Sequence, residues 1–121
     1  MRIAFALTIF LIAGACAHVG REGSNALVGQ WRYADAIQSC HYVFKRDGSF
    51  SGEVVYKGKK VSQFQGKWFV EADHLFYDYT GDVLGTIAAG SQDNDKLVVV
   101  AENYFVIEAR DGSKRRYNRI Q

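Results

Sequence analysis

Few residues of this sequence have the types and spacing that catalysis or metal binding requires. His18, His41 and His74 show no metal-ligand spacing. Cys40 and His41 are neighbours in a predicted strand and so point to opposite faces, which excludes a direct thiolate–imidazole pair. The acidic residues and histidine of segment 71–74 crowd one turn, where a hydrated turn is more frequent than a metal site. No nucleophile-elbow, zinc-protease, phosphate-loop or dinucleotide motif occurs, so we predict no catalytic residue, no metal, no cofactor and no enzymatic activity.

The aromatic side chains are the residues best suited to binding. The chain holds 8 Phe, 7 Tyr and 2 Trp among 121 residues. Such a set either fills the core of the domain or lines a cavity for a small hydrophobic or amphipathic molecule, whose orientation tyrosine hydroxyls would fix. Gly52 and Gly66 lie in phase with the aromatic residues and are expected to open space or to permit a bend. The inward face is predicted to carry Tyr42, Phe44, Phe50, Trp68, Tyr77, Tyr79 and Phe105.

The elements that must position these residues are β-strands, because the hydrophobic period from residue 28 onward is two. In segment 63–70, apolar residues and glycine alternate with Gln63, Gln65 and Lys67, as in a half-buried antiparallel strand. Asp47-Gly48 and Asp111-Gly112 separate two pairs of such runs and are typical of tight hairpins. Further turns are predicted at 58–60, 71–73, 93–95 and 102–103. Eight strands are predicted at 28–33, 40–46, 49–57, 61–70, 74–80, 96–101, 104–109 and 114–120.

The predicted fold is all-β, an eight-stranded antiparallel up-and-down meander that closes into a small barrel. Short connections favour sequential pairing, and eight strands suffice to close a barrel that is filled by side chains or holds one small ligand. A sandwich of two sheets is the alternative. Segment 81–94 has no clean period, and such a connection either packs on the domain or acts as a lid or recognition loop.

Three motifs make the chain resemble the small bacterial lipocalin-like (calycin) proteins. Gly29-Gln30-Trp31 lies on the first predicted strand, an Asp-Gly hairpin follows a Phe-bearing second strand, and Tyr117-Asn118-Arg119 closes the last strand. The resemblance implies a lipocalin-like barrel from Leu27 to Ile120. It also implies structural roles for Gly29, Trp31 and Arg119, in which the tryptophan lies across the barrel floor and the arginine packs over its ring.

The N-terminal residues predict export. Residues 1–17 combine Arg2, an apolar run from Ile3 to Ile12 and a small-residue cleavage zone, as in a signal peptide. Cleavage after Ala17 releases a free chain, whereas cleavage before Cys16 resembles the bacterial lipoprotein signal, in which this cysteine is lipidated. A flexible lead is predicted at 18–26 and the barrel domain at 27–121. The predicted location is the periplasm, either as a free protein or as an outer-membrane lipoprotein, or alternatively the medium as a secreted protein.

The charge balance and the cysteine content limit the classes of partner that the protein is expected to bind. Loss of Arg2 with the leader reduces the 15 basic residues to 14, against 13 acidic ones, and this balance predicts no nucleic-acid partner. Membrane association is expected only through an N-terminal lipid anchor. Cys40 alone remains as a thiol, so no intramolecular disulfide is expected. We therefore predict an exported, non-enzymatic protein that binds a small hydrophobic or amphipathic ligand. The alternative is a periplasmic interaction protein, of the hydrolase-inhibitor or immunity type, with a filled barrel.

Overall fold

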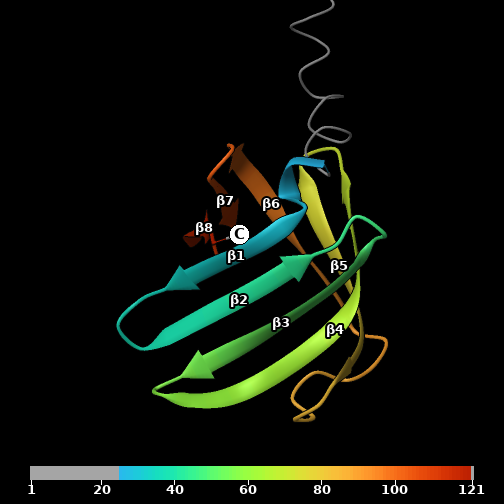
Figure 1. Cartoon of the computed structure of the whole chain (residues 1–121), viewed down its shortest axis with the longest axis vertical. Helices are drawn as coiled ribbons and strands as arrows, with labels where there is room; N and C mark the ends of the chain where they lie inside the picture. Colours follow the sequence, from blue (N-terminus) through green and yellow to red (C-terminus); the bar gives the residue numbers. More distant parts are fainter. Residues whose placement is uncertain (1–24, 121) are drawn as a thin grey trace, which may run out of the picture.

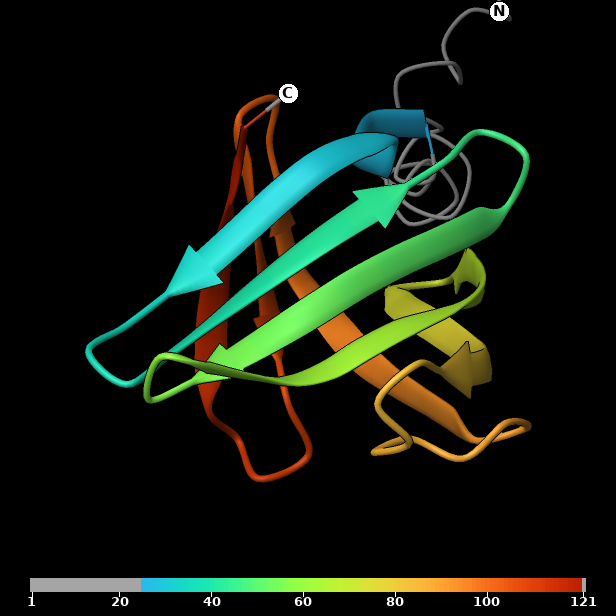
Figure 2. The same ribbon diagram turned by 60° about the horizontal axis from the view of Figure 1, so that its bottom comes forward.

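The computed structural model describes residues 25–120, which form eight antiparallel strands. Consecutive strands pair in chain order and the last pairs with the first, so the sheet closes into a barrel (Figure 1, Figure 2). The predicted all-β, eight-stranded up-and-down barrel is therefore confirmed. The strands are β1 (Gly29–Ala34), β2 (Gln38–Phe44), β3 (Ser49–Tyr56), β4 (Lys59–Glu71), β5 (His74–Asp82), β6 (Gln92–Val100), β7 (Tyr104–Glu108) and β8 (Lys114–Arg119).

The barrel closes through the pairing of β1 with β8. Trp31 lies opposite Arg119 and Arg32 lies opposite Asn118 in this register. The N–H of Ile120 extends the pairing by donating to the carbonyl of Gln30 at 2.9 Å. Closure leaves none of the described strands at the edge of an open sheet, which excludes the predicted alternative of a two-sheet sandwich.

Burial along the strands follows the period of two. In β4, every second residue from Ser62 to Val70 is buried and the residues between them are exposed, because successive side chains of a strand point to opposite faces. Both Asp-Gly hairpins are present, with Gly48 and Gly112 at φ angles of 91° and 86°. The turn predicted at 58–60 lies one residue earlier, at 57–58, and β4 begins directly after it.

The two ends of the barrel differ, and we call them the floor end and the mouth end. Alternate connections of an antiparallel meander lie at opposite ends. The floor end holds the connections at 45–48, 72–73 and 101–103, together with the helical residues 25–27. The mouth end holds the connections at 35–37, 57–58, 83–91 and 109–113. Within residues 25–120, no helix has the length and apolar character needed to span a membrane.

The structure corrects the predicted start of the sixth strand. β6 begins at Gln92, so the turn predicted at 93–95 and the strand start predicted at 96 are wrong. Asp93 pairs with Tyr77 and Asp95 pairs with Leu75 of β5. Polar residues suit a strand here because this part of β6 lies at the mouth end, where Asp93 is exposed and Asp95 is partly exposed. The irregular connection therefore shortens to 83–91.

Candidate ligand-binding site

Trp31 forms the floor of the barrel. Its side chain is fully buried, and its indole Nε1 donates to the carbonyl of Leu27 at 2.9 Å. Gly29 joins the helical residues to β1 with a φ of 141°, a conformation that residues with a side chain rarely adopt. The Cζ atom of Arg119 lies over the indole, 4.1 Å from the ring centroid. This is the arrangement that the family resemblance implies for Gly29, Trp31 and Arg119.

Arg119 also forms hydrogen bonds to separate chain segments at the floor end. Its Nη1 and Nη2 donate to the carbonyls of Val28 and Ala26 at 3.0 and 2.8 Å, and its Nε donates to the carbonyl of Glu102 at 2.8 Å. Residues 25 and 26, which the sequence analysis places in the flexible lead, are helical in the structure. The floor end is thus closed by a hydrogen-bonded clamp over Trp31.

Four of the predicted ligand-binding residues belong to a packed floor half. Phe44, Phe50, Trp68 and Phe105 are all buried. The ring of Phe44 lies 4.9 Å from that of Trp68, and Phe105 meets Trp31 edge-to-face at 4.9 Å. Rings at these centroid separations are in contact, so this half of the barrel is a filled core rather than a cavity.

Gly52 and Gly66 make room for rings rather than for a ligand. A Cβ atom at Gly52 would lie 2.6 Å from Cε1 of Phe64, and one at Gly66 would lie 2.9 Å from Cε1 of Phe50. The space that these glycines were expected to open is therefore occupied by two phenyl rings. Gly66 also lies at the register shift between β4 and β5, where an irregular ladder lets the strand bend.

Tyrosines dominate the interior toward the mouth end. The predicted residues Tyr42, Tyr77 and Tyr79 lie there together with Tyr33 and Tyr117, which the sequence analysis misses. The ring of Tyr42 stacks on that of Tyr77 at 5.7 Å and lies 5.4 Å from that of Tyr117. Burial raises the pKa of Tyr77 and of Tyr117. Burial therefore keeps these phenols neutral.

This mouth half keeps contact with solvent. Tyr42 is the one predicted ligand-binding residue that is only partly buried, although its ring contacts inward residues on several strands. Tyr33 and Val54 also pack against the core while remaining partly exposed. Arg115 lies beside them, with its Cζ atom 5.4 Å from the centroid of the Tyr33 ring.

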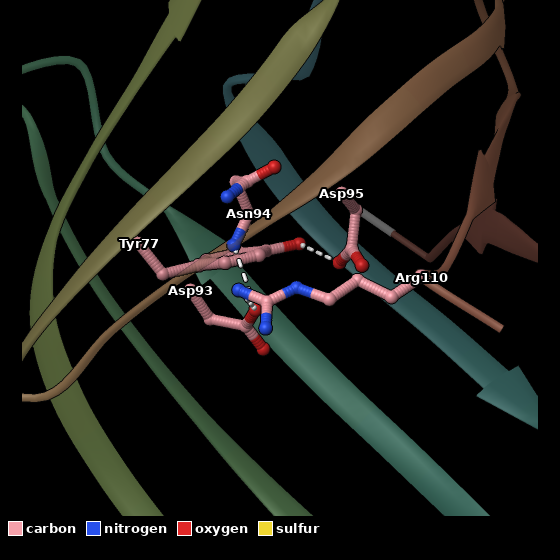
Figure 3. A network of polar contacts seen from close by, with 5 residues as sticks. All are labelled: Tyr77, Asp93, Asn94, Asp95 and Arg110. Atoms are coloured by element: carbon pink, nitrogen blue, oxygen red, sulfur yellow. Dashed lines mark hydrogen bonds and ion pairs between the residues drawn. The ribbon is translucent and has the colours of Figure 1, made fainter.

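A carboxyl group lies among the phenols. The hydroxyl of Tyr77 donates to Oδ2 of Asp95 at 3.1 Å (Figure 3), and burial raises the pKa of Asp95. Asp95 is absent from the predicted site because the sequence pattern predicts a turn at this residue. Its spacing of two from the buried Leu97 is the signal that places it on the inward face. The mouth half can therefore contact both apolar groups and groups that form hydrogen bonds.

The barrel wall has a gap beside Asp95. β6 pairs with β7 only from Lys96 onward, so residues 92–95 pair with β5 alone among the described strands. Arg110 reaches across the gap to Asp93, with 3.7 Å between Nη2 and Oδ1 (Figure 3). An exposed ion pair of this length is weak, so the gap offers a second approach to Asp95. It is a hollow of about 360 Å³ lined by Asp93, Asn94, Asp95, Ala109, Arg110 and Asp111.

The connection at 83–91, expected either to pack or to act as a lid, is fixed to the barrel. Oδ1 of Asp82 accepts the N–H of Gln63 at 3.0 Å and that of Leu84 at 2.9 Å. Its Oδ2 accepts the N–H of Ile87 at 3.2 Å, and Ile87 packs against the core. These contacts favour packing over movement as a lid.

The remaining reactive residues lie apart. Cys40 is buried and forms no disulfide within residues 25–120, and burial raises the pKa of its thiol, which lowers its reactivity. His41 interacts with Gln30, with 3.2 Å between Nε2 and Oε1. Residues 25–120 contain no group of three His, Cys, Asp or Glu that could hold a metal ion. The predicted signal peptide 1–17, the lipidation site Cys16 and His18 lie outside the described residues.

Comparison with known proteins bears on the fold. The chain is similar to a lipocalin-like protein from Bacteroides uniformis, with a TM-score of 0.57 and 17% sequence identity, covering 78% of this chain and 99% of the other. No protein-family model and no curated protein matches the chain. The barrel therefore has a lipocalin-like fold. At this identity the similarity extends to the fold alone, and function has to be argued from the site.

Proposed function

We propose that this protein is an exported, non-enzymatic binding protein that holds a small hydrophobic or amphipathic molecule in the mouth half of its barrel. The observation that carries the proposal is the division of the interior into two halves. Phe and Trp rings fill the floor half. In the mouth half Tyr77, Tyr79 and Tyr117 are buried as well, but Tyr33, Tyr42 and Arg115 remain partly exposed. The ligand site is therefore shallow and lies above the packed rings.

An amphipathic ligand suits this half because apolar surface and polar groups share one space. The ring of Tyr42 supplies apolar surface. The carboxyl of Asp95 and the guanidinium of Arg115, which are partly exposed, supply hydrogen-bonding groups. Small-molecule sites commonly combine a largely apolar lining with a few such groups. The hollow beside Arg110 reaches the carboxyl of Asp95 from the side of the barrel.

Export is supported by the signal-peptide pattern of residues 1–17, and a non-enzymatic role is supported by the absence of catalytic motifs from the sequence. Two forms of the mature protein follow from the two cleavage positions. Mass spectrometry of the mature N-terminus distinguishes a free chain that begins at His18 from an acylated chain that begins at Cys16. A chain that retains Met1 would contradict export.

Titration with the amphipathic dye 1-anilinonaphthalene-8-sulfonate, followed by displacement with palmitate, tests the ligand site. We expect saturable binding to the wild type. Tyr42→Trp adds bulk to the partly exposed inward ring and should weaken binding by about tenfold or more, because the larger indole takes up ligand space. The matched control Tyr104→Trp makes the same change beside Arg116 on the outer face and should bind like the wild type. Absence of saturable binding, or equal affinity of both variants, would overturn the proposal.

The second candidate is a periplasmic interaction protein of the hydrolase-inhibitor or immunity type. The filled floor half and the fixed connection at 83–91 favour it, because a rigid loop on a solid barrel suits recognition of a protein surface. In this case the mouth-end connections bind the partner and the barrel holds no ligand. Stoichiometric capture of one envelope protein, lost when Val83 and Leu84 are replaced by Ser, together with no dye binding, would support this candidate over the first.

A further inference from the structure

A second hollow lies on the outer face of the barrel wall, beside the gap that follows Glu108. Its volume is about 440 Å³, within the range of about 300–1,000 Å³ that small-molecule sites occupy. Strands β4, β5 and β6 and the connection at 109–113 form its walls. We call it the outer hollow, and its lining includes Phe69, Phe76, Asp78, Gln92, Asn94 and Arg110.

The strand register places the lining side chains next to one another. Phe69 lies opposite Phe76, which in turn lies opposite Asn94. Asp78 lies opposite Gln92, two residues closer to the mouth end. Directly opposite residues share one face of a sheet, and these positions of β4 and β5 alternate with buried ones. The side chains therefore form one continuous surface on the outside of the barrel.

The two phenylalanines form a stacked aromatic pair that remains in contact with solvent. Their ring centroids lie 4.8 Å apart and their ring planes differ by 9°. Phe69 is 50% exposed and Phe76 is partly buried. The neighbours of Phe69 on the same face of β4 are Lys67 and Glu71. The ring pair is therefore an isolated flat apolar surface on a polar face, available to a ligand.

Amide groups adjoin the ring pair. The side chains of Gln92 and Asn94 both line the outer hollow, and each amide can donate and accept hydrogen bonds. Asn94 lies directly beside Phe76 in the register. The outer hollow therefore combines flat apolar surface with groups that can bond both the hydrogen and the oxygen of a hydroxyl.

The charges around the outer hollow are balanced. The guanidinium of Arg110 reaches Asp93, with 3.7 Å between Nη2 and Oδ1 (Figure 3). Lys67 lies opposite Asp78 in the register of β4 and β5. Each of these acidic groups thus has a basic group beside it. This balance favours a ligand that carries no net charge.

We propose that the outer hollow binds a neutral saccharide, with one pyranose ring packed against the ring pair of Phe69 and Phe76. One face of such a sugar ring carries C–H groups, whose partial positive charge suits the negative face of a phenyl ring. The sugar hydroxyls donate and accept hydrogen bonds, as do the amides of Gln92 and Asn94. This site lies outside the barrel interior, so the inference goes beyond the proposed function.

Other occupants fit the outer hollow less well. A protein partner requires an interface of about 1,200–2,000 Å² in total, whereas the apolar surface here is confined to two rings. A wholly apolar molecule would leave the polar side chains of the lining without hydrogen bonds. A charged ligand would meet a group of like charge beside each group of opposite charge.

Titration of the isotope-labelled protein with cellotriose, followed by two-dimensional NMR, tests this proposal. The barrel and its core are formed by residues 25–120, so a chain that begins at residue 18 retains them all and lacks the apolar leader. Cellotriose is uncharged and carries C–H groups on both faces of its rings. We expect saturable shifts of backbone amide signals in segments 67–71, 74–78 and 92–96. The affinity should not fall as the salt concentration rises, because the sugar has no charge to be screened.

Three double or single variants and one control make the test specific. Phe69→Leu with Phe76→Leu keeps apolar bulk but removes the planar faces, and should weaken cellotriose binding by about tenfold or more. Phe69→Tyr with Phe76→Tyr keeps those faces and should bind like the wild type. Asn94→Ala should weaken binding by about threefold or more. The matched control Tyr56→Leu with Tyr104→Leu removes two rings outside the outer hollow and should also bind like the wild type.

Absence of saturable shifts, or equal losses in the leucine variant and its control, would overturn the proposal once thermal unfolding shows that both are folded. Tighter and salt-sensitive binding of a heparin tetrasaccharide would also overturn it, because the outer hollow would then select an anion. Cellotriose should bind with unchanged affinity in the presence of palmitate, and competition between the two would place the sugar in the barrel interior instead. The dye titration of Tyr42→Trp involves no sugar, so failure of one proposal leaves the result for the other intact.

Discussion

The substitution Arg119→Met tests how far the floor of the barrel depends on one guanidinium group. Methionine keeps an unbranched side chain against the indole of Trp31 and removes the positive charge that lies 4.1 Å from the ring centroid. It also removes hydrogen bonds of 3.0 and 2.8 Å to the carbonyls of Val28 and Ala26, and one of 2.8 Å to Glu102. We expect the barrel to remain folded and to lose stability.

The magnitude follows from these contacts. A cation–π contact contributes about 0.5–2 kcal/mol, and this one lies over a fully buried ring. The two part-buried hydrogen bonds contribute about 0.5–1.5 kcal/mol each, whereas water replaces the exposed bond to Glu102. The expected decrease in the free energy of unfolding is therefore about 3 kcal/mol, which lowers the melting temperature of a domain of this size by about 12–24 °C.

Urea unfolding followed by tryptophan fluorescence measures this decrease, because Trp31 and Trp68 are both buried. The control is Arg116→Met. Arg116 lies 3.8 Å from the centroid of the Tyr104 ring and bonds the exposed side chain of Asn118, so its loss should cost less than about 1 kcal/mol. A decrease below about 1 kcal/mol for Arg119→Met, or equal decreases for the two variants, would refute the role assigned to Arg119.

Two further predictions concern the interior. Gly52→Ala should lower the free energy of unfolding by about 1–3 kcal/mol, because the added Cβ would lie 2.6 Å from the Phe64 ring. The control Gly81→Ala, whose Cβ would have no atom within 4 Å, should change the free energy of unfolding by less than about 0.5 kcal/mol. Equal effects of the two variants in chemical unfolding would contradict this prediction. Burial raises the pKa of Asp95 above its ordinary value of 3.8, so the folded protein keeps this proton to higher pH than the unfolded chain, and the Asp95 contribution to stability falls as pH rises between the two pKa values. Asp95→Asn removes this pH-dependent loss of stability. Urea unfolding should therefore show that the variant gains stability relative to the wild type from acid toward neutral pH. A stability difference between variant and wild type that stays constant with pH would show that the Asp95 carboxyl does not cause the loss.

The strand pattern of the fold could be predicted because local signals and tertiary position agree. In β4, the alternation of apolar residues with Gln63, Gln65 and Lys67 matches the alternation of buried and exposed positions. Both Asp-Gly pairs form the expected turns, since glycine adopts the positive φ that they need. At the start of β6 the local signal and the tertiary position disagree. Asp93 to Asp95 have the composition of a turn, and only their position beside β5 at the mouth end makes them a strand.

The candidate site could be predicted in part for the same reason. The period of two identifies the inward residues of β2 and β5, but it cannot say how deep in the barrel each one lies. Depth depends on register, which brings Phe44 beside the floor and leaves Tyr42 partly exposed. Tyr33 and Tyr117 each lie two residues from a floor residue, Trp31 and Arg119 respectively, so the strand period contained the signal for both. Asp95 was not predicted as an inward residue because its composition-based assignment placed it in a turn.

Depth also separates most of the aromatic residues by type, although Phe64 lies beside Tyr42 and Tyr79 toward the mouth. Moving two residues from floor to mouth exchanges Trp31 for Tyr33 on β1, Phe44 for Tyr42 on β2 and Leu75 for Tyr77 on β5. A barrel that only needed filling would be packed as well by phenylalanine, without the cost of burying hydroxyls that need partners. Two of these hydroxyls are paired within the protein, that of Tyr33 with the carboxyl of Asp35 and that of Tyr77 with the carboxyl of Asp95. The phenols that gather toward the mouth are therefore the part of the interior in which a ligand that carries polar groups should be sought.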